Sequence, residues 1–273
     1  MPHPPELLDP DRIRSRISAD ILQHVARLEV FTELNSTNSH LLGGPAPAPG
    51  NLTVALAEFQ RAGRGRMGRT WTMPPRSGIG LSVGWSFPEA PGDLPALSLA
   101  AGVATRRVIQ AACRRAPALK WPNDLVWNDR KLGGILVETA SGQGGSCHVV
   151  VGLGLNVSVD SQILWNLGER PGSATDLATM TAGRPPRRNN LAARLIEGYF
   201  AMFGIFEESG FAAFRTLFGE ADYLKGRPVT VTDGPFRLSG TANGVDSGGA
   251  LILMTGDGKR RIFSGDVTVR PAR

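Results

Sequence analysis

The spacing of hydrophobic residues divides the N-terminal third of the chain into short alternating elements. "DRIRSRISADILQHV" at 11–25 predicts one amphipathic helix, and "LEVFTEL" at 28–34 predicts a strand. "NSTN" at 35–38 carries side chains that cap helices, and "SHLLGG" follows as a short helical body. "NLTVALAEF" at 51–59 predicts a buried strand, and "SGIGLSVGWSF" at 77–87 predicts a second, partly alternating strand.

The middle of the chain predicts two long helices around three strands. Helical spacing extends over 93–116 and over 188–210. The strand candidates are "ALKWPNDLVWN" at 118–128, "KLGGILVETA" at 131–140 and "CHVVVGLGLNV" at 147–157, separated by the turns "NDRK" and "SGQGG". Turns this short favour an antiparallel or mixed sheet. We expect 147–157 to be an exposed strand, available for edge-to-edge pairing in a homodimer.

From residue 226 onward the pattern changes to short β runs. "PVTVT", "FRLSGTANGV", "ALILMT" and "RRIFSGDVTVR" are separated by the turn clusters "DGP", "DSGG" and "GDGK". The runs predict a small β-barrel-like domain of fewer than fifty residues. A domain of this size is marginally stable alone, so we expect it to pack on the larger one.

Composition narrows the class of protein without deciding it. The 273 residues are 41% hydrophobic and 20% charged, as in a soluble globular protein. The opening "MPHPPELLDP" lacks the apolar core of a signal peptide, and no apolar run reaches membrane-spanning length. Cys113 and Cys147 match no zinc or redox spacing, so we expect inert thiols and a cytoplasmic location. The net charge of +6 suits nucleic acid and also small polyanions such as ATP.

The stretch "GRGRMGRTW" at 63–71 nearly fits several phosphate-binding templates. It satisfies G-x-G-x-x-G and misses a P-loop by one residue, but both templates need a helix after the loop. Pro74 and Pro75 oppose such a helix. A disordered Arg-Gly RNA-binding tract is disfavoured by the strands on either side. A solvated loop without a role is the remaining simple interpretation.

The order of several motifs favours a more specific interpretation. "STN" at 36–38, the loop at 63–71, "KWPND" at 120–124, "KLGGIL" at 131–136 and "VVGLGLNV" at 150–157 follow one another. This series resembles the biotin protein ligases, and the "SGDVTVR" near the C-terminus is similar to the family too. The resemblance implies two steps: ATP activates biotin to biotinyl-5′-AMP with release of pyrophosphate, and a carrier lysine then displaces AMP.

By this resemblance, one set of residues binds biotin. Ser36, Thr37 and Asn38, with Gln60 nearby, line the end that holds the ureido ring. Lys120 bridges the biotin carboxylate and the α-phosphate and, with Arg66 of the loop, is a predicted catalytic residue. The full predicted biotin-binding set is Ser36, Thr37, Asn38, Gln60, Arg64, Gly65, Arg66, Lys120, Gly133 and Gly134.

The resemblance implies a nucleotide-binding set as well. Trp71 stacks on adenine and Arg69 faces the triphosphate. The complete set is Arg69, Trp71, Asn123, Lys131 and Asn156. Asp124 is the candidate ligand of Mg²⁺, which proteins hold mainly through phosphates and few carboxylates.

The implied fold is α+β, with a mixed sheet flanked by helices as in the class II aminoacyl-tRNA synthetases and biotin ligases. We expect an N-terminal extension at 1–28, a catalytic domain at 29–224 and an SH3-like β domain at 225–273. The expected partner is the biotin carboxyl carrier domain of a carboxylase. About thirty residues precede the motifs, too few for a winged helix, so we expect a monofunctional enzyme without specific DNA binding or membrane association. The alternatives are a lipoate–protein ligase and a nucleic-acid-binding repressor.

Overall fold

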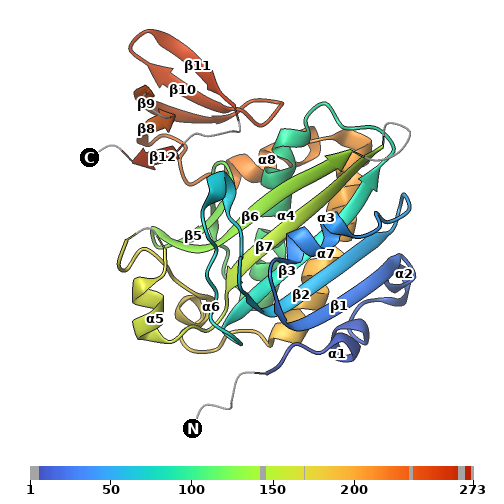
Figure 1. Ribbon diagram of the computed structural model, residues 1–273. Helices are drawn as coiled ribbons and strands as arrows, with labels where there is room; N and C mark the ends of the chain where they lie inside the picture. Colours follow the sequence, from blue (N-terminus) through green and yellow to red (C-terminus); the bar gives the residue numbers. More distant parts are fainter. Residues whose placement is uncertain (1–5, 142–145, 169, 234–235, 264–267, 272–273) are drawn as a thin grey trace.

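A computed structural model gives the architecture of the chain (Figure 1) and describes residues 6–141, 146–168, 170–233, 236–263 and 268–271. Its centre is a seven-stranded mixed sheet in the order β1-β2-β3-β7-β6-β5-β4, in which β1 and β2 are parallel and the other neighbours antiparallel. The strands are β1 (Val25–Leu34), β2 (Leu52–Gln60), β3 (Gly78–Phe87), β4 (Ala118–Lys120), β5 (Asp124–Trp127), β6 (Arg130–Ser141) and β7 (Cys147–Asn156). The predicted mixed sheet is confirmed.

Two long helices cover one face of this sheet, and a short helix lies on the other (Figure 1). The long helices are α4 (Leu97–Cys113) and α7 (Arg188–Ser209), which agree with the predicted ranges. α8 (Ala212–Ala221) packs beside them, and α3 (Thr37–Gly43) lies on the opposite face. Trp85 of β3 stacks on Phe203 of α7 with ring centroids 5.2 Å apart, which places the aromatic core on the long-helix side.

The alternation in β3 and β7 explains why the α3 face is hollow. On the long-helix side β3 presents Leu81, Val83 and Trp85, all buried in the core. Residues of the other parity, such as Gly80 and Ser82, face α3, and β7 repeats the pattern with Gly152 and Gly154. Small residues on one face leave space above the sheet while the other face packs densely.

The predicted helix at 11–25 is wrong. The structure has two short helices, α1 (Pro10–Arg14) and α2 (Ala19–Leu22), and Val25 already belongs to β1. Ser18 between them is extended, and its backbone N–H donates to the Glu197 carboxylate of α7. Tertiary contacts therefore divide a segment whose apolar spacing suits one helix.

Two strand expectations also need correction. The run at 118–128 is two strands, because the chain turns at 121–123 and β5 pairs antiparallel with β4. The strand at 147–157 is not exposed: β7 pairs with β3 and β6 and is almost entirely buried, so the proposed edge for a homodimer is wrong. β1 and β4 form the edges of this sheet. The short helices α5 (Ser161–Asn166) and α6 (Leu177–Met180) and the longer α8 were not predicted.

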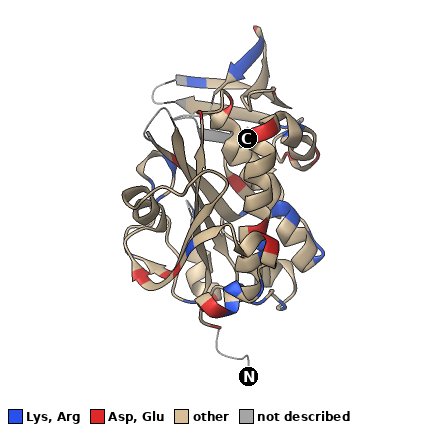
Figure 2. Ribbon diagram, turned by 90° about the vertical axis from the view of Figure 1, so that its right-hand side faces the viewer, with Lys and Arg blue, Asp and Glu red and all other residues tan. Residues whose placement is uncertain are grey.

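The C-terminal domain is a five-stranded antiparallel sheet in the order β11-β10-β9-β8-β12 (Figure 1), and Figure 2 shows Lys and Arg residues along part of it. Its strands are β8 (Pro228–Asp233), β9 (Phe236–Val245), β10 (Leu251–Thr255), β11 (Gly258–Ile262) and β12 (Thr268–Pro271). The predicted run at 260–270 is thus two strands. The C-terminal domain packs on the larger domain as expected: Trp121, 1% exposed, donates a 2.9 Å hydrogen bond to the carbonyl oxygen of Gly249.

Some sequence expectations fall outside the described residues. They concern the first five residues of the opening "MPHPP", most of the "SGQGG" turn, part of the "DGP" turn and the "SGDV" of the C-terminal motif. In the described part, no helix has the length and apolar character needed to cross a bilayer. Burial raises the pKa of Cys147 and of the half-buried Cys113, which disfavours the reactive thiolate of both.

Candidate active site

A cavity of about 880 Å³ opens on the α3 face of the sheet. Its lining comes from α3, the ends of β2 and β7, the loop at 61–71, the β4–β5 turn, the start of β6 and the segment at 166–174. It includes every predicted site residue except Gly133. Segments more than a hundred residues apart in the chain therefore converge on one space.

The end of the cavity beneath α3 is a network of hydroxyl and amide groups. Ser36 caps α3, as the sequence predicts, by accepting the N–H of Ser39. Gln60 Oε1 accepts from the backbone N–H of Thr37 at 2.9 Å and lies 3.2 Å from its hydroxyl. Ser82 Oγ lies 2.7 Å from Thr37 Oγ1 and 2.5 Å from Asn38 Oδ1. This end presents fixed donors and acceptors to a polar ring.

The Arg-Gly loop is folded back on itself over the cavity. Gly65 N–H donates to the carbonyl of Arg69 at 2.7 Å, and Trp71 N–H donates to that of Gly63 at 2.9 Å. A single 3₁₀ turn at Arg66–Gly68 forms the tip, and β3 begins at Gly78 without an intervening helix. The dinucleotide-binding and P-loop templates are therefore excluded by the observed geometry. Met67 is 49% exposed and is not among the residues that line the cavity.

The "KWPND" segment places three predicted residues, Lys120, Asn123 and Asp124, at the turn between β4 and β5. Lys120 ends β4 and lines the cavity, and buried Trp121 follows it directly. Asn123 Nδ2 donates to the carbonyl of Ile135 at 2.8 Å, while Ile135 N–H donates back to the carbonyl of Asn123 at 2.9 Å. This reciprocal pair holds the turn against β6.

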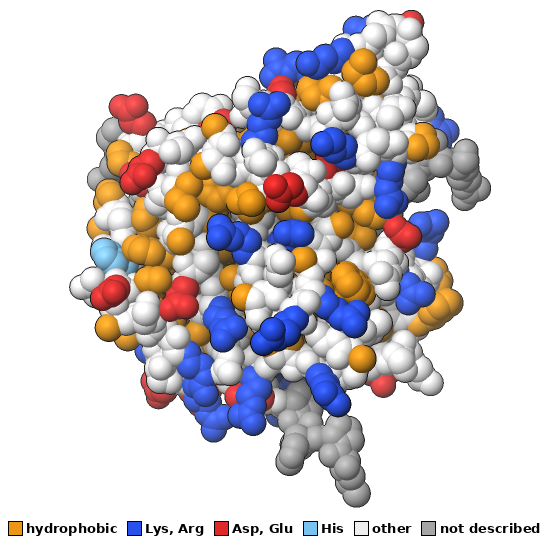
Figure 3. All heavy atoms as spheres, turned by 180° about the vertical axis from the view of Figure 1, so that it is seen from behind, with side chains coloured by type: hydrophobic (Ala, Val, Ile, Leu, Met, Phe, Trp, Pro, Cys, Tyr) orange, Lys and Arg blue, Asp and Glu red, His pale blue; other side chains and the backbone are white. Residues whose placement is uncertain are grey.

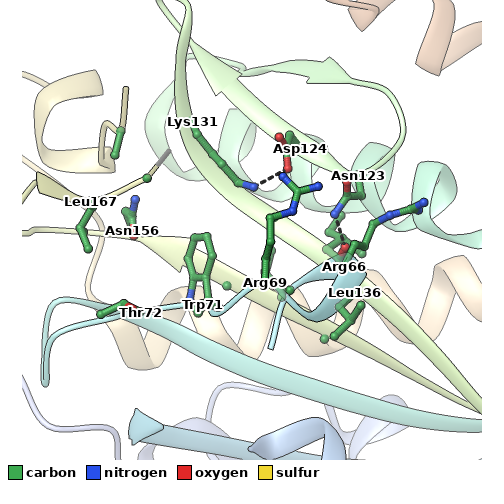
Figure 4. Close-up of a pocket in the computed structure, with 18 of the residues that line it drawn as sticks. Arg66, Arg69, Trp71, Thr72, Asn123, Asp124, Lys131, Leu136, Asn156 and Leu167 are labelled. Carbon is green, nitrogen blue, oxygen red and sulfur yellow. Dashed lines mark hydrogen bonds and ion pairs between the residues drawn. The ribbon is translucent and has the colours of Figure 1, made fainter. Parts of the chain in front are cut away.

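The opposite end of the cavity is aromatic and charged (Figure 4). Trp71 packs against Gly154 of β7, where an added Cβ would be 2.2 Å from the indole. Lys131 Nζ is 5.9 Å from the centroid of that ring and 2.7 Å from Asp124 Oδ1. Asn156, 3% exposed, donates to the carbonyl of Thr175 but leaves its Oδ1 unpaired, and Trp71 Nε1 is likewise unpaired. Buried polar atoms of this kind normally have partners, so a ligand with matching groups suits this end.

The sequence missed some contributors to the site. Ser82 and Glu138 contact Asn38 from apolar strands, where a single polar residue gives little signal. Asp129 and Tyr223 meet at the cavity mouth, where the tyrosine hydroxyl donates to the carboxylate at 2.7 Å. Burial raises the pKa of Tyr223, and the Asp129 carboxylate raises it further.

Gly133 is the predicted residue that does not line the cavity. It lies in the β5–β6–β7 ladder, where an added Cβ would be 2.6 Å from the carbonyl oxygen of Gly154. Close backbone packing therefore accounts for this glycine. Gly134 lines the cavity beside Lys131 and Asp124.

A magnesium ion fits this donor set only as a partner of phosphates. Within the ranges that the structure describes, no three His, Cys, Asp or Glu side chains converge as a metal site. Asp124 is one cavity carboxylate, and it is paired with Lys131. Because Mg²⁺ is usually held by one or two carboxylates and substrate phosphates, this set suits an ion delivered with a nucleotide.

The fold and the site define a class of protein. A mixed sheet carries, in one cavity, a polar end, an arginine-glycine loop, a lysine on a rigid turn and an aromatic end. This combination suits an enzyme that activates a carboxylic acid with a nucleotide.

Comparisons with known proteins identify the family. Residues 30–156 match the Biotin/lipoate A/B protein ligase family, and residues 225–270 match the Biotin protein ligase C terminal domain. The bifunctional ligase/repressor BirA of Salmonella typhimurium is 33% identical over all of this chain and 81% of its own length. The biotin–[acetyl-CoA-carboxylase] ligase of Paracoccus denitrificans is 31% identical, over 87% of this chain and 98% of its own. The chain belongs to the biotin protein ligase family.

A solved structure has the same fold. The biotin protein ligase of Aquifex aeolicus, in complex with biotin and ATP, superposes with a TM-score of 0.78 at 24% identity. The match covers 90% of this chain and all of the other. The expected α+β architecture with a small C-terminal β domain is therefore confirmed.

Proposed function

We propose that this protein activates biotin with ATP and transfers it to a lysine of a biotin carboxyl carrier domain. The observation that carries the proposal is the convergence of the predicted biotin and nucleotide residues on one cavity. The relatives named as biotin–[acetyl-CoA-carboxylase] ligases support the reaction and the carrier. Residues 29–224 would form the catalytic domain and 225–273 the C-terminal domain.

In the first step, a carboxylate oxygen of biotin attacks the α-phosphorus of ATP, and the bond to pyrophosphate breaks. Both reactants are anionic, so cationic groups must screen their repulsion and hold them in line. Lys120 on its rigid turn and Arg66 on the loop would supply these charges. Thr37, Asn38 and Gln60 would hold the ureido ring at the polar end.

The nucleotide would occupy the aromatic end. Trp71 would stack on adenine, and Asn156 would place its unpaired Oδ1 toward a base donor. Arg69 and Lys131 would face the phosphates. Mg²⁺, which neutralises phosphate charge when bound, would be held by these phosphates and Asp124.

In the second step, the amine of the carrier lysine attacks the carbonyl carbon of the adenylate, and AMP leaves. The mixed anhydride reacts with water and with other amines. The Arg-Gly loop, which already covers the cavity, would retain it until the carrier arrives.

The experiment that tests the proposal is biotin-dependent exchange of radiolabelled pyrophosphate into ATP, with lipoate and octanoate run in parallel. Exchange with biotin alone establishes the adenylation step without a carrier protein. Exchange with lipoate instead would assign the protein to lipoate ligation. Transfer is then measured with a purified carrier domain and its lysine-to-alanine variant.

We also expect no sequence-specific binding to duplex DNA. Figure 3 shows basic side chains over the helical face with acidic and apolar groups between them, rather than one continuous stripe. A gel shift at low salt tests this expectation. A discrete, sequence-dependent complex would contradict it.

A further inference from the structure

One carboxylate oxygen joins the polar end of the cavity to the Arg-Gly loop. Glu138 lies on β6, and its Oε2 accepts from Asn38 Nδ2 at 2.8 Å and from Arg64 Nη2 at 2.8 Å. Its side chain is 25% exposed and does not line the cavity. The carboxylate therefore acts on a bound molecule only through the two side chains that it holds.

On its buried side, Glu138 decides the orientation of the Asn38 amide. Asn38 is 4% exposed, and its Nδ2 faces two acceptors, the Glu138 carboxylate and the carbonyl of Leu136 at 3.3 Å. With the amino group directed there, Oδ1 is directed to Ser82 at 2.5 Å and lies over Gly152. Removing the carboxylate removes the closer of the two acceptors that hold the amide in this orientation.

On its outer side, the same carboxylate ties the loop to the sheet. Arg64 is 42% exposed and pairs across the loop with Thr70 in a β-bridge. Its bond to Glu138 is charge-assisted, so it is stronger than a neutral hydrogen bond of the same length. A second ion pair, Arg61 with Glu33, anchors the base of the loop to β1 away from the cavity.

We propose that Glu138 is a positioning residue that couples the ureido end of the biotin site to closure of the Arg-Gly loop. The proposal rests on the proposed function, because it takes biotin as the molecule in contact with Asn38. Biotin at the polar end fixes Asn38, which fixes Glu138 and in turn holds Arg64 and the loop. By linkage, a held loop strengthens biotin binding by the same factor.

The test compares Glu138→Gln and Glu138→Ala with Glu33→Gln, which removes the charge of the other loop ion pair. Glutamine keeps an acceptor for Asn38 but loses the charge that holds Arg64. Two quantities are measured on the full chain: amide hydrogen exchange of residues 61–71 with and without biotin, and KM for biotin and for ATP in pyrophosphate exchange. Circular dichroism checks that each variant is folded.

We expect Glu138→Gln to reduce the biotin-induced protection of the loop roughly two- to fivefold, the range of a partly exposed ion pair. Salt should weaken this protection in the wild type and have little effect in Glu138→Gln. Glu138→Ala should also raise KM for biotin about tenfold while KM for ATP stays within about twofold, since Asn38 and Arg64 lose a partner and the aromatic end of the cavity loses none. Glu33→Gln should show the same biotin-induced protection of the loop as the wild type.

Two results would overturn the proposal. In the first, Glu138→Gln and Glu138→Ala both keep the loop protection and the KM for biotin of the wild type. In the second, Glu33→Gln reduces the biotin-induced loop protection as much as Glu138→Gln does. If Glu138→Ala does not fold, the loop protection of Glu138→Gln and its salt dependence test the proposal on their own. A wild-type protein without biotin-dependent exchange would refute the proposed function itself, and the coupling with it. The wild-type measurement thus separates the two failures.

Discussion

Trp121 Nε1 donates a 2.9 Å hydrogen bond to the carbonyl oxygen of Gly249, and this bond links the residue after Lys120 to the C-terminal domain. Trp121 is among the largest fully buried side chains of the protein. The turn that carries Gly249 is itself held by Asp246, which accepts from the N–H groups of Gly248 and Ala250 at 2.9 Å. The C-terminal domain therefore supports the backbone from which Lys120 extends.

Trp121→Phe tests this support. The variant keeps an aromatic ring at this position but removes the indole N–H and leaves the Gly249 carbonyl without its partner, so we expect a loss of about 1–2 kcal/mol in unfolding free energy. Because Lys120 is adjacent, the rate of pyrophosphate exchange should also fall. Trp85→Phe is the matched control: its Nε1 donates to Glu207 at 3.1 Å on the long-helix face. Wild-type exchange in Trp121→Phe would contradict the relationship.

Lys120→Ala should lower biotin-dependent pyrophosphate exchange by about a hundredfold or more, the scale for removing one group that stabilises developing charge. Thermal unfolding should change little, since the side chain lines a cavity. Lys259→Ala, on the exposed strand β11, removes the same charge elsewhere and should leave exchange intact. Comparable losses in both variants would point to general charge rather than to position.

The glycines of β7 should separate the two ends of the cavity. An added Cβ at Gly152 would be 2.2 Å from Asn38 Oδ1, and one at Gly154 would be 2.2 Å from the Trp71 ring. Gly152→Ala should therefore raise KM for biotin, and Gly154→Ala should raise KM for ATP, each by about tenfold or more from overpacking. Gly204→Ala, with open space around it on α7, is the control. Equal effects on both substrates in either variant would contradict the assignment of the ends.

Arg66→Gly should still form the adenylate but release it too readily. The loop would lose a guanidinium over the cavity while keeping its backbone bonds. Biotin should then appear on lysines of an unrelated protein added to the reaction, measured by blotting. Limited proteolysis near Arg61–Arg69, suppressed in the wild type by biotin with ATP, should be suppressed less. Labelling confined to the carrier domain would show that Arg66 does not retain the adenylate.

His148 should make stability depend on pH. It is 4% exposed with Nε2 unpaired, and burial lowers its pKa below the ordinary 6.5. Below about pH 6.5 the unfolded chain binds a proton that the folded chain does not, so stability falls with pH from there toward the lower, folded pKa. Denaturant unfolding between pH 5 and 8 (about the range in which histidine titrates) should show this loss. His148→Gln should be less sensitive over the same range.

Hydrophobic periodicity predicts most of the elements of the fold, namely those in which the spacing of apolar residues along the chain agrees with their packing in the structure. β2, β3, β6, β7, α4 and α7 each have enough periodic residues to be recognised. The prediction of one helix at 11–25 is wrong because α7 holds the chain just before this segment and in its middle: Asn189 binds the backbone of Leu7 and Asp9, and Glu197 binds that of Ser18. A sequence pattern does not contain such partners.

For the site too, the sequence predicted some residues correctly and missed or misassigned others. Contiguous motifs predicted residues that line the cavity, because loops and strand ends bring short runs to one place. Glu138 was missed because its role depends on Asn38 and Arg64, 100 and 74 residues away. Gly133 was assigned to the ligand although backbone packing alone explains it, since a glycine motif does not show which of its members faces a cavity.

Arg188 at the start of α7 has a consequence for the order of folding. Arg188 is 4% exposed, and its guanidinium donates two hydrogen bonds to the Glu58 carboxylate of β2. It also donates to the carbonyl of Glu6. Glu58 in turn accepts the N–H of Leu8. The N-terminal segment is thus held by a residue 182 positions away, and its docking site does not exist until α7 lies against the sheet. Contacts this distant carry the largest loop-closure cost, so residues 6–14 should gain protection last during refolding.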